Sequence, residues 1–141
     1  MLAVILAGLA PPPARGVQPS VEELKAKLSS ANSNDKPKLC LQIAQRQLDA
    51  ADKLYVASEI EKAQTALTDA VSYAELARDY AIQAHKHEKQ TEIAVRGMVR
   101  KLNDLLHTLT HEERPPVEDA MVRLQHVRDD LLASMFPKGG K

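Results

Sequence analysis

Two histidines with metal-ligand spacing are the clearest chemical signal in the sequence. His107 and His111 lie four residues apart, which on a helix places both imidazoles on one face. Residues 110–114 are expected to form a loop, however, and that would separate the two rings. The alternative is a pair of solvent-facing histidines near a helix C-terminus, where positive charge is favourable. His85 and His87 are two residues apart, so on a helix they face different ways and form a weaker pair.

Other patterns of catalytic or cofactor-binding residues are missing from the sequence. It contains no glycine-rich phosphate loop, no Gly-x-Ser-x-Gly elbow, no paired-cysteine motif and no Cys-x-x-Cys-His haem attachment site. The single cysteine, Cys40, cannot form an intramolecular disulfide, and we expect it to be a small core residue, the alternative being a disulfide between two chains. The sequence therefore predicts a protein that is not an enzyme and that uses no cofactor.

A basic stripe is the main charged feature. Lys89, Arg96 and Arg100 share one face of a predicted helix, and this face suits an acidic partner, an anionic lipid surface or simply water. The whole chain has 19 Lys and Arg against 19 Asp and Glu, whereas domains that bind nucleic acid are usually basic. No aromatic residue is interleaved with the stripe to stack on bases. Nucleic acid is therefore not an expected partner.

The composition predicts an all-α protein with one domain. The chain has 141 residues, which suits a single core, and 44% of them are hydrophobic, which argues against wholesale disorder. Only 3% are aromatic, none is tryptophan, and Ala, Leu, Gln, Lys and Glu, which favour helices, are abundant. A β-sandwich or barrel would need more aromatic and β-branched residues and more glycine turns.

Helical periodicity predicts an antiparallel helical bundle built on one long central helix. Shorter helices are expected at about 20–31, 37–56 and 116–135, and short loops fold them back on the long one. Between them an apolar repeat of three and four residues continues without proline through 59–109, which predicts a helix about 75 Å long. The polar stretch 85–90 is the expected place for any break, and a break would give a compact bundle instead of a rod. Capping boxes are expected at 20–23 and 58–61.

The first half of the predicted long helix carries a seam of small residues. Ala63, Ala70, Ala74, Ala77 and Ala81 recur at helical spacing, which lets two helix axes approach closely. Three tyrosines near this seam are the predicted anchors for a protein partner, because tyrosine supplies a large contact area at little cost in entropy: Tyr55, Tyr73 and Tyr80.

The N-terminal residues are predicted to lie outside the fold. Residues 2–10 are apolar and uncharged, too short to span a bilayer and typical of the apolar region of a signal peptide. We expect residues 1–16 to be a signal peptide or an apolar N-terminus, residues 17–136 to form the helical domain, and residues 137–141 to be a flexible basic tail. Cleavage is expected between Pro11 and Gly16, with export to the periplasm or the extracellular space.

The hairpin expected around Ser58 resembles one unit of the tetratricopeptide family. The residues that carry the resemblance are Ala50, Ala51, Leu54, Ser58, Ala63, Leu67 and Ala70. It covers residues 47–75 and departs from the family pattern at three positions: Gln47 replaces the aromatic residue, Ser58 the turn glycine and Glu75 the closing proline. No second copy follows at a 34-residue offset, although solenoids generally need three or more units. The resemblance implies a module that binds proteins.

Together these observations predict a non-enzymatic helical protein of the cell envelope or periplasm that binds another protein. The partner is unidentified, and a homo-oligomer is compatible with the same surface. A metal- or cofactor-binding bundle that uses His107 and His111 is one alternative. A peripheral membrane rod that uses the basic stripe is the other.

Overall fold

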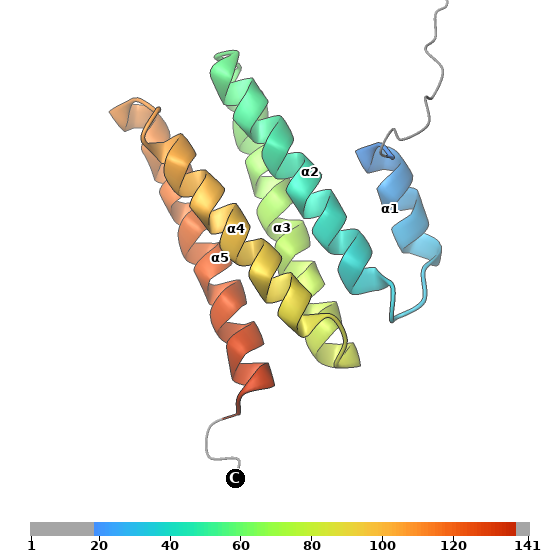
Figure 1. Ribbon diagram of the computed structural model, residues 1–141. Coiled ribbons are helices and arrows are strands. Elements are labelled where there is room, and N and C mark those ends of the chain that lie inside the picture. Colours follow the sequence, from blue (N-terminus) through green and yellow to red (C-terminus); the bar gives the residue numbers. More distant parts are fainter. Residues whose placement is uncertain (1–18, 138–141) are drawn as a thin grey trace, which may run out of the picture.

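The computed structural model describes residues 19–137, and within them every regular element is helical (Figure 1). The elements in chain order are α1 (Val21–Ser30), α2 (Lys36–Val56), α3 (Ile60–Ala84), α4 (Glu88–Leu106), the short 3₁₀ helix η2 (His111–Glu113) and α5 (Arg114–Met135). The predicted all-α class is confirmed. The expected signal peptide and most of the basic tail lie outside the described residues.

Two antiparallel helical hairpins pack side by side to form the bundle. The first hairpin is α2 with α3 and the second is α4 with α5 (Figure 1). Across the two hairpins α2 contacts α4 and α3 contacts α5, so α2 and α4 form one layer and α3 and α5 form the other. Helix α1 packs beside α2 at the edge of the first layer. The predicted antiparallel bundle is therefore confirmed.

The prediction of one continuous helix over 59–109 is wrong, because the chain turns at residues 85–87. His85 and His87 adopt left-handed conformations with φ of 55° and 65°. The Lys86 amide donates to the Ala81 carbonyl at 3.1 Å and the His85 amide to the Ile82 carbonyl at 3.3 Å, the pattern of a Schellman cap. The polar turn contributes no apolar side chain to the seam. Folding back there lets both halves of the apolar stripe be buried within one molecule.

The turn between α2 and α3 also differs from its expected form. Ser58 has a φ of 63°, its amide donates to the Tyr55 carbonyl, and the Glu59 amide donates to the Leu54 carbonyl at 2.8 Å. This is a second Schellman cap, so Ser58 ends α2 and does not cap α3 with its side chain. The capping box expected at 58–61 is therefore wrong, whereas the box of Ser20 and Glu23 at the start of α1 is confirmed.

The alanine seam is buried between the helices, as the periodicity predicts. Ala63, Ala74, Ala77 and Ala81 are fully buried in α3, and α2 and α3 form the most extensive helix contact. Cys40 of α2 is also fully buried, and desolvation raises the pKa of its thiol to about 11. The cysteine is therefore a core residue with no thiolate available at neutral pH.

Along residues 19–137 no helix combines the length and the apolar character that crossing a bilayer requires.

Candidate interaction site

The two histidines that the sequence pairs do not share a helix. His107 follows the last residue of α4, and its Nδ1 lies 2.7 Å from the Asn103 carbonyl oxygen. His111 begins η2, where the Thr110 amide donates to a Glu113 carboxylate oxygen at 3.1 Å. Among residues 19–137 no three or more His, Cys, Asp or Glu side chains are grouped so that they could hold a metal ion. The Glu113 carboxylate therefore caps the backbone at the start of η2.

The three tyrosines that the sequence predicts as anchors differ in how deeply they are buried. Tyr55 is 6% exposed, and burial raises the pKa of its phenol. Tyr73 and Tyr80 are half-buried, and each ring has a lysine ammonium 5.2 Å from its centroid: Lys25 of α1 lies over Tyr73, and Lys36 of α2 over Tyr80. Tyr55 therefore offers no face to a partner, and the other two rings help to dock α1 and α2 onto α3.

One member of the basic stripe takes part in an internal ion cluster. Glu92 of α4 is 3% exposed. Its carboxylate accepts hydrogen bonds from Arg96 Nη2 at 2.5 Å, Arg96 Nε at 3.2 Å and Arg128 Nε of α5 at 2.9 Å. These bonds, those from Arg96 foremost, hold the pKa of the Glu92 carboxyl below its usual range despite the opposing effect of burial. The cluster joins α4 to α5. Arg96 is itself about half-exposed, and Lys89 and Arg100 of the same stripe are exposed as well.

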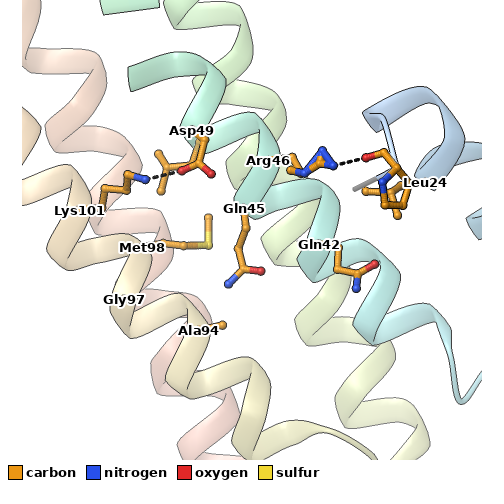
Figure 2. A pocket seen from close by; sticks show the side chains of 11 residues that line it. Leu24, Gln42, Gln45, Arg46, Asp49, Ala94, Gly97, Met98 and Lys101 are labelled. Atoms are coloured by element: carbon orange, nitrogen blue, oxygen red, sulfur yellow. Dashed lines mark hydrogen bonds and ion pairs between the residues drawn. The ribbon is translucent and has the colours of Figure 1, made fainter. Parts of the chain in front are cut away.

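A groove of about 630 Å³ lies between α2 and α4 (Figure 2). The residues that line it come from α2, α4 and the N-terminal end of α1: Pro19, Leu24, Gln42, Gln45, Arg46, Leu48, Asp49, Ala94, Gly97, Met98 and Lys101. Leu48 and Met98 are almost fully buried and form its floor. In Figure 2 the Met98 and Gln45 side chains extend into the space between the two helices. The groove is about as large as many binding pockets.

The charged groups along the groove are engaged with other parts of the chain. The Lys101 ammonium pairs with the Asp49 carboxylate across the groove, and Arg46 donates to the Pro19 carbonyl (Figure 2). The arrangement contains no nucleophile with an adjacent base. Gly97 leaves one wall open, because a Cβ built there would meet no atom within 4 Å.

Charge is divided between the two layers of the bundle. Along α2 and α4 six cationic side chains are exposed against two anionic ones: Lys38, Lys53, Lys89, Arg96, Arg100 and Lys101, against Asp49 and Asp104. Along α3 and α5 only Lys62 is an exposed cation, against six exposed anions: Glu61, Asp79, Glu118, Asp119, Asp129 and Asp130. We name the outer surface of α2 and α4 the cationic face and that of α3 and α5 the acidic face. The groove opens on the cationic face.

Sequence reasoning found part of this site and missed the rest. The stripe on α4 supplies half of the exposed cations of the cationic face, whereas Lys38 and Lys53 come from a helix far away in sequence. Gly97 shows in the sequence only as a glycine inside a helix, a tolerable cost to stability. Its place in a groove depends on how α2 and α4 are set side by side.

We find no match for this chain among models of known protein families, among characterised proteins or among solved structures.

Proposed function

We propose that the protein is a non-enzymatic helical module that binds another protein on its cationic face. The observation that carries this proposal is the groove between α2 and α4, where Gly97 leaves open space and the charged rim groups already have partners. The resemblance of residues 47–75 to a tetratricopeptide hairpin, which implies protein binding, supports the same reading. Placement in the cell envelope remains part of the proposal, since the predicted export signal lies outside the described residues.

A bound protein is favoured over a small ligand because the groove is open and its polar groups are dispersed. Its polar side chains, such as Gln42 and Gln45, are spread along the rim and do not converge on one point. Small-molecule sites are usually enclosed, with a few polar groups aimed at one ligand. A polar rim around a small apolar floor is the ordinary anatomy of a protein interface.

Groove filling at Gly97 tests the proposal. The full chain serves as bait in extracts of its source organism, and a retained protein is then measured for direct binding. Gly97→Leu projects a side chain into open space, so we expect the fold to survive and the affinity to fall by at least about tenfold. Ala133→Leu, at an exposed position of α5, is the matched control and should bind normally. A retained protein that binds both variants equally well would refute the groove as its site.

Exposed Ile93 favours an anionic lipid surface as the second candidate partner. Ile93 is 49% exposed on α4, between Lys89 and Arg100 of the same helix. Apolar and cationic side chains on one helix face suit a membrane interface. Co-sedimentation with vesicles containing anionic lipid, compared with neutral vesicles, decides between this reading and a protein partner.

A further inference from the structure

The two faces of the bundle are complementary to each other in charge. The cationic face exposes six cations and two anions, and the acidic face exposes six anions and one cation. The faces belong to opposite layers, so a single molecule cannot bring them together. Two molecules can, when the acidic face of one lies on the cationic face of the next. The formal net charge of the whole chain is zero, so overall repulsion does not oppose such a contact.

Ion pairs between the helices show which residues of the two faces lie at the same position along the bundle axis. Arg128 of α5 donates to Glu92 of α4, and these helices run antiparallel, so Gly97 lies opposite Arg123, about five residues further along each helix. Arg123 in turn pairs with Glu75 of α3 at 2.7 Å. The open part of the groove on one face and the Arg123–Glu75 pair of the other layer therefore lie at the same level of the bundle.

Two exposed apolar side chains of the acidic face lie at the same position along the bundle axis as Gly97. Leu76 of α3 is 37% exposed and Val122 of α5 is 55% exposed, and each is next in sequence to a member of the Arg123–Glu75 pair. When two molecules are stacked without a shift along the bundle axis, these side chains lie at the height of the open space at Gly97. Apolar contact therefore favours stacking without a shift along the bundle axis.

We propose that copies of this chain stack front to back, with the acidic face of one copy on the cationic face of the next. The inference rests on the proposed function, because it names the occupant of the same face. Such a contact uses two different surfaces, so each added copy leaves one face of each kind free and assembly continues beyond a dimer.

The size of the faces suits a weak, reversible contact. A helix of about 20 residues is about 30 Å long, and two neighbouring helices are about 20 Å wide, so one face offers roughly 600 Å². Two such faces bury about 1,200 Å² together, the lower limit for specific interfaces. Because the attraction is largely between exposed charges, it should weaken with salt.

A second copy is favoured over an unrelated acidic protein because the required surface is present in the chain itself. An external partner would need both a matching acidic strip and an apolar protrusion. Helix α5 of the chain itself supplies both, in Glu118, Asp119 and Asp129 with Val122 between them in sequence. The unrelated partner remains an outcome of the test.

Charge substitutions on each face in turn test the proposal on the full chain. Sedimentation velocity follows the average mass across a concentration series at about 0.05 M and 0.5 M NaCl. Lys53→Glu with Arg100→Glu leaves the cationic face with four exposed cations and four anions, and Asp119→Lys with Asp129→Lys leaves the acidic face with four exposed anions and three cations. All four positions are exposed, so each double variant removes most of the net charge of one face. We expect association beyond a dimer at low salt and a loss of at least about tenfold in association constant for either double variant.

The matched control for Lys53→Glu with Arg100→Glu makes the same two changes from a cation to an anion away from both faces. Lys27→Glu with Lys86→Glu alters α1 and the turn before α4, and it should associate like the wild type. Circular dichroism checks that each variant folds. A wild-type chain that stays monomeric at low salt, an assembly that stops at a dimer, or a control that weakens association equally would overturn the inference. A monomeric chain that still loses a bound protein on Gly97→Leu would leave the proposed function standing without the stacking.

Discussion

The substitution Glu92→Gln tests how the second hairpin is held together. Glutamine keeps the size of the side chain but replaces a charged oxygen by an amide group that donates hydrogen bonds. Three bonds of 2.5–3.2 Å from Arg96 and Arg128 are affected. A hydrogen bond to a charged group contributes about 1.5–3 kcal/mol, and breaking a fully buried ion pair costs about 3–5 kcal/mol. The Arg96 side chain is half-exposed and can be rehydrated, so we expect a loss of about 2–3 kcal/mol at pH 7.

The pH dependence of this loss gives a second check on the same carboxylate. The pKa of Glu92 is lower in the folded protein than in the unfolded chain, so the charged carboxylate stabilises the fold above the unfolded value of about 4.3. That contribution is lost as the pH falls through the folded value, and the difference between wild type and Glu92→Gln should therefore shrink in acid. Urea unfolding across this pH range measures it.

Glu118→Gln, at an exposed position of α5, is the control for the loss of one carboxylate and should stay within about 0.5 kcal/mol of the wild type. If Glu92→Gln also unfolds within about 0.5 kcal/mol of the wild type at pH 7, the buried cluster does not stabilise the hairpin and the reasoning is refuted.

Two further substitutions probe the packing of the helices. Ala74→Leu should lower the free energy of unfolding in urea by about 1–3 kcal/mol, because Ala74 is fully buried in the seam. Ala133→Leu on the surface should be nearly neutral. Equal losses of stability in the two variants would mean that Ala74 does not lie in a tightly packed seam. Gly97→Ala should raise the free energy of unfolding by up to about 1 kcal/mol, because alanine favours helix and its Cβ has open space. A loss of stability there, measured by thermal melts, would mean that the groove is filled within the molecule.

Local sequence signals account for the helices and for much of the core. The three–four spacing of Ala63, Ala70, Ala74, Ala77 and Ala81 states which face of α3 is buried, because helix geometry repeats every 3.6 residues wherever the helix lies. The capping box at Ser20 and Glu23 forms as expected, since it involves only neighbours in sequence. Locality alone is not sufficient, because the capping box expected at 58–61 also involves only neighbours in sequence, and there Ser58 ends α2 in a Schellman cap instead.

The turn at residues 85–87 shows where local reasoning stops. The apolar repeat keeps its phase through this segment, and nothing in the repeat distinguishes a continuous rod from two antiparallel helices. What decides is the burial of both halves of the stripe in one core, α3 mainly against α2 and α5 and α4 mainly against α5, a sum over contacts between residues far apart in sequence. The left-handed conformations of His85 and His87 cost some backbone strain, which this burial offsets.

The sequence by itself determined an all-helical chain, its buried alanine seam and half of one cationic surface. Only the tertiary structure decided that Tyr55 is core, that Glu92 is held by two arginines, and that α2 and α4 enclose a groove. The division of charge into two faces is also a tertiary property. Each helix has its own charge pattern, but a face exists only once two helices lie in one layer, and that pairing follows from packing rather than from the residues of either helix.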